Sequence, residues 1–391
     1  MQADFHYYAA YCAAYLAGFS HGESLAIAYS DQFTDCCTKS YLNHIHGPYA
    51  AATTQVPAEL MDVNTDILGL QDITRIWASF HFLPYDLYAE TPKACREYRD
   101  KFRLLCGPNG DLVEDTVERA KGRGLQAAGL AMHAVSDTWA HMYFAGTPSL
   151  VMNNITSYFF EETPEGERRV HFVHSPRQRD DPETGQYLNS VSASSENSVA
   201  NLGHGRAGHL PDYSYARYRY LPAWGGCREI VKDNPSDYLH AFAQMVRALR
   251  YLRGDLPEFH KGEYDWGITD PYKDKIVDIL SVRRIDASAD WKAFGESLSG
   301  HPIPDFSTET YEQEYLHTPQ EEKNQTFLGR FFLAALGQKS MVTNKIWASG
   351  NLLAGKSVEY DGKAFHGIRD YARLISERIE NTDLHDLFGG Q

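Results

Sequence analysis

The sequence has few of the features that hold small secreted proteins together or anchor membrane proteins. Its six cysteines include no C-x-x-C pair, and a chain of 391 residues can bury a sufficient core without disulfides. No apolar run approaches the length of about 20 residues that a membrane-spanning helix needs. The run from Tyr7 to Phe19 lacks the basic start of a secretion signal. We therefore expect a cytoplasmic protein with free thiols and no transmembrane segment.

Positive charge is also scarce. There are 37 Lys and Arg residues against 52 Asp and Glu, which gives a formal net charge of −15. Such a surface repels a bare phosphate backbone, so binding of duplex nucleic acid by a basic patch is disfavoured. An acidic ester substrate would need help from bound cations. The content of 43% hydrophobic and 23% charged residues is that of an ordinary globular protein.

Strand signals are poor, because no Asn-Gly or Asp-Gly turn lies between alternating apolar runs. Helix signals recur instead. Ser20 to Glu23 forms a capping box, and Gly337 is placed to stop the last long helix. A cap residue followed by proline, which is typical of a helix start, occurs at Thr91-Pro92, Asn234-Pro235, Asp270-Pro271 and Thr318-Pro319. We predict an all-α protein, a bundle of many helices.

The polar segment from 161 to 202 shows no helical period and predicts a long irregular excursion. The first helix is expected over residues 4–18. We predict a helical core over residues 1–225, which includes the excursion, and a helical C-terminal portion over 226–391 packed on the same domain.

The most informative segment runs from Gly124 to Gly146. Its small and apolar residues predict a buried helix, yet it carries His133, Asp137 and His141 at i, i+4 and i+8, along one stripe. A buried carboxylate between two histidines needs a cation or complete hydrogen bonding. Coordination of a metal and a core hydrogen-bond network both satisfy this need, and the helix alone does not choose between them.

Other histidines and aspartates form smaller groups. The glycine-rich turn 203–212 contains His204, His209 and Asp212, with Arg206 beside them. A loop histidine is usually exposed, and Arg206 could either clamp a phosphate or simply be solvated.

Three further positions precede the central helix. His81 lies among aromatic residues before a proline, where a hydrogen-bonded core histidine is the ordinary alternative. Asp4 and His6 lie in the first turn of the first helix. Asp31 and Asp35, at i and i+4, share a face of the second helix, and we expect Asp31 to be exposed.

Together these residues resemble the zinc-dependent phospholipase C and fungal single-strand nuclease superfamily. The stretch 133–141 is similar to the H-x-x-x-D-x-x-x-H helix of heterokaryon-incompatibility (Het-C) proteins, in which a Gly-His turn ending in Pro-Asp also follows. Three short segments, 4–8 at the start of the chain, 80–84 and 203–205, together look most like a bacterial family of uncharacterised function. The likeness covers roughly residues 1–225.

The resemblance implies two or three divalent metal ions, zinc being the expected one, in the helical bundle. Asp137 would bridge two ions beside His133, and Asp35 and His81 (or His44 or His46) would complete the first position. His6, with Asp4 or the chain's N-terminus, would serve a second position. The third would be held by His141 and His204 with Asp212 or His209.

The implied activity is hydrolysis of a phosphoester or phosphodiester by a metal-activated water, with Asp35 and Asp137 as the catalytic carboxylates and Arg206 as a substrate contact. The substrate would be a small molecule or a lipid. The alternatives are a non-catalytic metalloprotein and a helical scaffold whose His and Asp residues form core hydrogen bonds.

Overall fold

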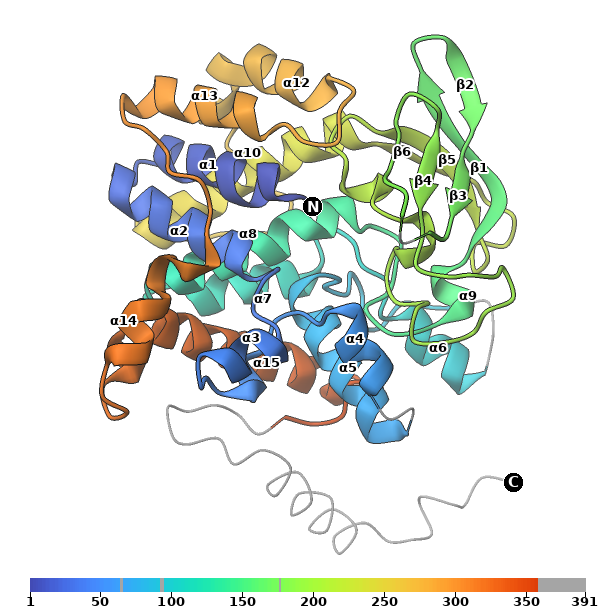
Figure 1. Cartoon of the computed structure of the whole chain (residues 1–391), viewed down its shortest axis with the longest axis horizontal. Coiled ribbons are helices and arrows are strands. Elements are labelled where there is room, and N and C mark those ends of the chain that lie inside the picture. Colours follow the sequence, from blue (N-terminus) through green and yellow to red (C-terminus); the bar gives the residue numbers. More distant parts are fainter. Residues whose placement is uncertain (64–65, 92–94, 176, 358–391) are drawn as a thin grey trace, which may run out of the picture.

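The computed structural model describes residues 1–63, 66–91, 95–175 and 177–357 (Figure 1). About 52% of the described residues are helical. It also contains a four-stranded antiparallel sheet and a two-stranded parallel sheet, so the prediction of an all-α protein is wrong and the fold is mixed. In Figure 1 the strands lie together on one side of the molecule with α6 and α9 below them, most other helices lie on the other side, and the N-terminus lies near α8.

Three long helices form the centre of the helical part: α2 (His21–Phe33), α8 (Leu125–Ala140) and α10 (Asn234–Arg253). The first helix begins as a π-helix, η1 (Asp4–Ala9), and continues as α1 (Ala10–Leu16) against α2 and α10. The last long helix, α15 (Phe327–Ala348), packs on α5 (Ile67–Phe80) and α8. The other α-helices are α3 (Lys39–His44), α4 (Pro57–Asp62), α6 (Arg96–Phe102), α7 (Asp111–Ala120), α9 (Leu150–Asn153), α11 (Trp266–Thr269), α12 (Lys273–Ser281), α13 (Ser288–Ser299) and α14 (Glu312–His317).

The larger sheet has the strand order β2-β1-β5-β6, and all its neighbours are antiparallel. Its strands are β1 (Ile155–Thr163), β2 (Gly166–Arg169), β5 (Arg217–Pro222) and β6 (Ile230–Asp233). Strands β3 (His171–Val173) and β4 (Gln186–Leu188) form the parallel pair. The segment 161–202, expected to be irregular, therefore contributes to both sheets.

The sequence does contain a strand signal, which is an alternating pattern of residues and not a turn motif. Strand β5 reads Arg-Tyr-Arg-Tyr-Leu-Pro, and its tyrosines point inward at every second position. Tyr218 and Tyr220 stack on Phe159 of β1, with ring centroids 5.1 and 5.3 Å apart. The β1–β2 hairpin turns through Pro164-Glu165, not through an Asn-Gly or Asp-Gly pair.

Several predicted helix boundaries can be checked. The capping box at Ser20 and Glu23 is confirmed, and α10 begins at Asn234-Pro235 as expected. Thr318-Pro319 does not start a helix, because α15 begins only after its cap at Thr326. Gly337 does not stop that helix but lies inside it. The signal at Thr91-Pro92 and the C-terminal segment 358–391 fall outside the described residues.

Helices α2 and α8 approach each other closely at Gly129. A Cβ atom there would lie 2.2 Å from the carbonyl oxygen of Ile27 and 2.6 Å from Cβ of Ser30, so only glycine fits. Asp31 follows Ser30 on α2, and His133 lies one turn after Gly129 on α8. The close packing therefore brings Asp31 and His133 together, with Asp31 Oδ1 3.2 Å from His133 Nδ1.

None of the helices in the described part of the chain combines the length and apolarity needed to cross a membrane.

Candidate metal centre

Side chains from six segments of the chain converge beside α8. His6 comes from η1, Asp31 from α2 and Asp35 from the turn after it. His81 is the C-cap of α5, and His141 is the C-cap of α8 itself, which ends at Ala140 and not near Gly146 as predicted. The remaining members are His133 and Asp137 of α8 and His204 and Asp212 of the glycine-rich turn.

The first group brings together ligand atoms of Asp35, His81 and His133, with Asp137 beside them. His81 Nδ1 and His133 Nε2 are 3.1 Å apart, and each lies 3.2 Å from Asp137 Oδ2. Asp35 Oδ1 lies 3.7 Å from both nitrogens. Ligand atoms that share one ion at bond lengths of about 2.1 Å are separated by about 3.4 Å. The ligand atoms of Asp35, His81 and His133 therefore lie close enough together to share one ion, and Asp137 Oδ2 lies beside both nitrogens.

The second carboxylate oxygens of Asp35 and Asp137 face His6. Asp137 Oδ1 lies 3.2 Å and Asp35 Oδ2 4.0 Å from His6 Nε2. Both carboxylates thus present one oxygen to the first group and the other to His6. This is the arrangement of ligands that bridge two neighbouring ions.

A further group gathers around Asp212. Its Oδ1 atom lies 2.9 Å from His141 Nε2 and 3.4 Å from His204 Nε2. The amino nitrogen of Met1 lies between this group and Asp137, at 2.7 Å from Asp137 Oδ1, 3.4 Å from Asp212 Oδ1 and 3.3 Å from His141 Nε2. In this structure the amino group joins the two halves of the cluster.

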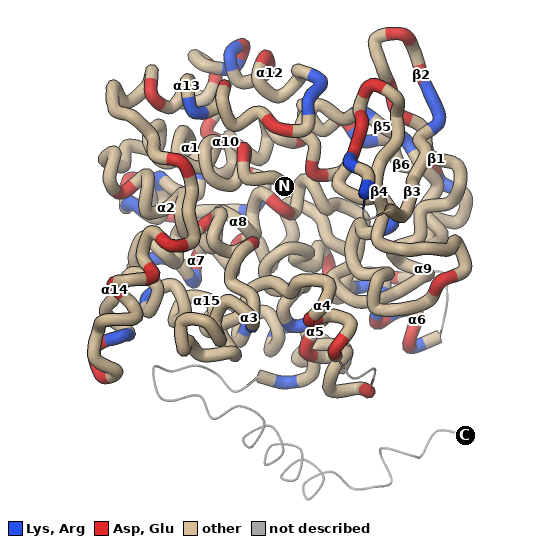
Figure 2. Tube along the Cα trace, viewed as in Figure 1, with Lys and Arg blue, Asp and Glu red and all other residues tan. Residues whose placement is uncertain are grey.

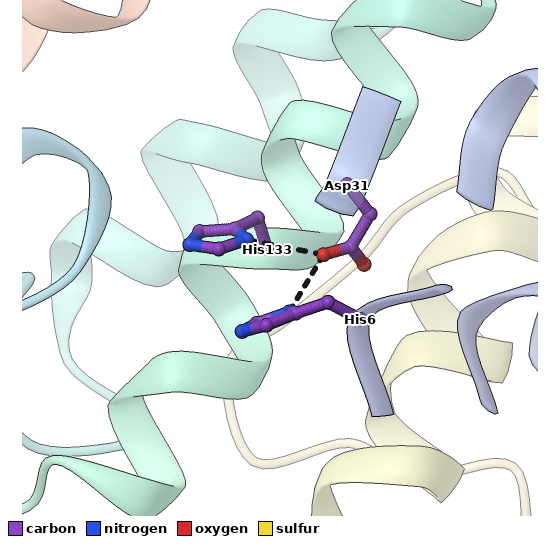
Figure 3. Close-up of side chains that lie close together, drawn as sticks. All are labelled: His6, Asp31 and His133. Atoms are coloured by element: carbon purple, nitrogen blue, oxygen red, sulfur yellow. Dashed lines mark hydrogen bonds and ion pairs between the residues drawn. The ribbon is translucent and has the colours of Figure 1, made fainter. Parts of the chain in front are cut away.

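Asp31 holds two of the histidines. Its Oδ1 atom accepts hydrogen bonds from Nδ1 of His6 at 2.7 Å and from Nδ1 of His133 at 3.2 Å (Figure 3). Because a carboxylate can only accept, the proton lies on Nδ1 of each ring, and Nε2 faces the aspartates of the cluster. The prediction that Asp31 is exposed is wrong, since it is fully buried.

The other three histidines are fixed in the same way by backbone carbonyls. His81 Nε2 donates to the oxygen of Thr53 at 2.9 Å, and His141 Nδ1 donates to that of His81 at 2.6 Å. His204 Nδ1 donates to the oxygen of Gly208 at 2.6 Å. In all five histidines one nitrogen is tied to an oxygen and the other points at Asp35, Asp137 or Asp212. Metal-ligating histidines are oriented by such hydrogen bonds.

The charges of the ion-free cluster are balanced by protons. Burial opposes charge on His133, but Asp137 and Asp35 outweigh it and raise the pKa to about 10. The pKa of the Met1 amino group rises to about 11, because Asp137 and Asp212 overcome its desolvation. Burial alone would raise the pKa of Asp137. The positive charges of His141, the amino group and the other histidines together outweigh burial and hold this pKa well below its usual value. Burial lowers the pKa of His204 to about 4, so this ring is neutral at pH 7 and can ligate.

Contacts with the ring of Phe82 place His141 and His204, the two histidines of the group around Asp212. Phe82 stacks on His141 with ring centroids 4.6 Å apart and lies 5.7 Å from the ring of His204. Gly203 has a φ of +54°, and a Cβ atom there would lie 2.1 Å from Cζ of Phe82. Glycine at this position lets the turn close down on Phe82, which brings His204 to Asp212.

Some sequence-predicted residues lie outside the ligand positions. Asp4 accepts hydrogen bonds from the backbone of Phe5 and Ala287, and His44 and His46 are exposed on the far end of α3. His209 bonds Asp212 Oδ2 at 3.2 Å through Nδ1, with a side chain that is 61% exposed.

Arg206 is not available to clamp a substrate as predicted. Its guanidinium donates to Asn201 Oδ1 at 2.5 Å and to the carbonyls of Ser194 and Glu196, and the residue is buried. It holds the segment 194–201 beside the glycine-rich turn.

Access to the cluster is provided at Asp35. His6, Asp31, His133 and Asp137 are at most 1% exposed, whereas the side chain of Asp35 is 33% exposed. Solvent therefore reaches the cluster at Asp35 and, to a smaller extent, at His204, whose side chain is 14% exposed.

Comparison with known proteins gives one match. Neither a curated protein nor a solved structure matches the chain. The sequence model of DUF6765, a family of unknown function, matches residues 1–346, which is most of the chain. The protein belongs to this family of unknown function.

Proposed function

We propose that the cluster binds two or three divalent transition metal ions, zinc first among them, and that the protein hydrolyses a phosphoester or phosphodiester. The observation that carries the proposal is the hydrogen bonding and orientation of the five histidines His6, His81, His133, His141 and His204. Each has one ring nitrogen tied to a protein oxygen and the other directed at a shared set of aspartates.

The alternative of a core hydrogen-bond network explains the cluster less well. Asp31 Oδ2 is buried and has no hydrogen-bond partner within the described ranges. His6 and His133 stack at a centroid distance of 3.9 Å, although both have raised pKa values in the ion-free protein. Two stacked imidazolium rings repel each other. Metal ions would replace their protons and remove this repulsion.

The charge balance supports more than one ion. Four aspartates contact the histidines of the cluster: Asp31, Asp35, Asp137 and Asp212. Asp31, Asp137 and Asp212 are buried and Asp35 is partly exposed, and buried carboxylates are costly unless cations compensate them. Two divalent ions carry the matching four positive charges. Imidazole and carboxylate ligands suit zinc, and also iron, manganese and nickel.

Held by these histidines and aspartates, a pair of such ions would supply an activated water with a pKa of about 7 and positive charge to neutralise a phosphoester. The residues supply the rest of the site. Asp35 and Asp137 set the spacing between the two positions through their paired oxygens, and Asp31 fixes the rings of His6 and His133. The partly exposed face at Asp35 is where substrate enters. The likeness to the phospholipase C and nuclease superfamily agrees with this chemistry.

The test is hydrolysis of three probes by zinc-reconstituted protein: p-nitrophenyl phosphate, bis-p-nitrophenyl phosphate and a soluble short-chain phosphatidylcholine. We expect metal-dependent turnover of at least one probe and its loss in Asp35→Asn. Asp274→Asn, an exposed aspartate on α12, is the matched control and retains activity. Full metal occupancy with no turnover of any probe would leave a non-catalytic metal site and overturn the hydrolase proposal.

A further inference from the structure

A cavity lies away from the candidate metal centre, between α7, α8 and α15. Its volume is about 430 Å³, which is in the range of pockets for small organic ligands. Part of its wall is apolar, from Leu130, Ala131 and Leu333. The polar part is dominated by Arg119, Arg123 and Arg330. None of the candidate metal ligands lines it.

Three arginines around one cavity are unexpected in a chain with a net charge of −15. No Asp or Glu is among the residues that line the cavity. In the part of the chain that the structure describes, no carboxylate lies within 4.0 Å of Arg123 or Arg330. Figure 2 shows that elsewhere along the trace Lys and Arg are interspersed with Asp and Glu. The cavity therefore has a positive charge that the protein does not neutralise at Arg123 and Arg330.

The third arginine is positioned by a glycine. Gly337 lies inside α15, where it weakens the helix, and a Cβ atom there would lie 2.1 Å from Nη2 of Arg119. Any other residue would displace the guanidinium from the cavity wall. Gly337, which was predicted to end the helix, instead leaves room for the guanidinium of Arg119.

The N-terminus of α8 adds to the positive field. Its cap, Gly124, provides no side-chain hydrogen bond, so the first-turn amides lack a side-chain acceptor. Ala127, in that turn, lines the cavity. The helix dipole and the arginines act in the same direction on a ligand here.

We infer that this cavity binds an organic anion with an apolar portion. A phosphate or carboxylate group would meet the guanidinium groups, and the hydrocarbon part would cover Leu130 and Leu333. Arginine pairs with such groups in a bidentate manner, and burial of the apolar part adds hydrophobic free energy.

Octylphosphonate, whose P–C bond a phosphoester hydrolase does not cleave, is the probe, and its binding to the full-length metal-loaded protein is measured by isothermal titration calorimetry. Removal of a charge-assisted hydrogen bond weakens binding by about tenfold. We expect a loss of at least about tenfold in Arg123→Gln/Arg330→Gln, whose altered side chains are exposed. Arg179→Gln/Arg228→Gln makes the same change of net charge at two other exposed arginines and should bind as the wild type does.

Two further measurements separate the cavity from the metal centre and from simple phosphate binding. Ala334→Phe fills the cavity from α15 and should also weaken binding. Inorganic phosphate should bind more weakly than octylphosphonate. Equal binding by wild type and Arg123→Gln/Arg330→Gln would overturn the inference. So would binding that is lost only in Asp137→Asn, because the probe would then occupy the metal centre.

Discussion

The imidazole rings of His6 and His133 stack with their centroids 3.9 Å apart and an angle of 21° between their planes. They come from η1 and α8, and one carboxylate oxygen of Asp31 accepts a hydrogen bond from both. A single buried side chain thus sets the orientation of two candidate ligands that belong to different metal positions. Removing it should disturb both positions at once.

We predict that Asp31→Ala lowers metal affinity by about 10–100-fold, the usual effect of removing a residue that orients a ligating histidine. The reason is that His6 and His133 lose both their fixed orientation and the carboxylate that increases their basicity. Affinity is measured by competition with a coloured chelator. Asp274→Ala, on the exposed face of α12, is the control. Unchanged affinity in Asp31→Ala would show that Asp31 does not orient ligands.

The contact between α2 and α8 gives a second prediction. Gly129→Ala places a methyl group against the carbonyl of Ile27, so we expect the free energy of unfolding to fall by about 1–3 kcal/mol. Metal content should fall as well, because separation of the helices moves Asp31 and Asp35 away from His133. Gly22→Ala, where no atom lies within 4 Å of the new methyl group, should stabilise the protein by up to about 1 kcal/mol. Metal content that survives in Gly129→Ala would contradict this account of the packing.

Arg206 is predicted to act on the third metal position indirectly. Arg206→Met leaves Asn201 Oδ1 and the carbonyls of Ser194 and Glu196 without their donor, at a cost of about 1–3 kcal/mol. The neighbouring turn should loosen, and the protein should lose about one metal equivalent while retaining the rest. Elemental analysis beside thermal unfolding measures both effects. Arg228→Met, at an exposed site, is the control, and full metal content in Arg206→Met would rule out the indirect role.

Lys339 gives a prediction on pH that does not involve the cluster. Its amino group donates to the carbonyls of Ala50 and Ala52 and is faced by Asp72, Cys37, Lys39 and Arg75. Burial lowers its pKa from 10.5 to about 8, against the attraction of Asp72.

Between about pH 8 and 10.5 the unfolded chain holds a proton on Lys339 that the folded chain has released. The contribution of Lys339 to the free energy of unfolding therefore rises with pH in this window. Chemical denaturation at several pH values should show that wild type gains stability relative to Lys339→Met from pH 8 to 10. Parallel curves for the two proteins would mean that the pKa of Lys339 is not lowered.

The sequence carried more information on the site than on the fold. The spacing of His133, Asp137 and His141 identified the central helix, and the resemblance led to His6, Asp35, His81, His204 and Asp212, which the structure brings together. Asp31 could not be found by pattern, because an aspartate beside Asp35 on a helix surface is usually solvated. Only the contact at Gly129 reveals that this face of α2 is buried.

The sheet was missed for a different reason. Its tightest turn, between β1 and β2, is formed by Pro164-Glu165, and β5 and β6 are joined by the longer loop 223–229, so a search for Asn-Gly and Asp-Gly turns detected neither hairpin. The alternating Arg-Tyr-Arg-Tyr run of β5 was the available signal. Gly337 shows the converse error, in which a local helix-stop signal was overridden by tertiary packing against Arg119.

The central claim, that these residues hold a cluster of metal ions, is tested most directly by elemental analysis of the purified, untagged protein and of Asp137→Asn. One oxygen of Asp137 faces His6 and the other faces His133, whereas the closest carboxylate contact of His141 is with Asp212. We predict at least two transition metal equivalents per chain in the wild type and no more than about one in Asp137→Asn. A wild-type protein that holds no metal, even after reconstitution, would contradict the account.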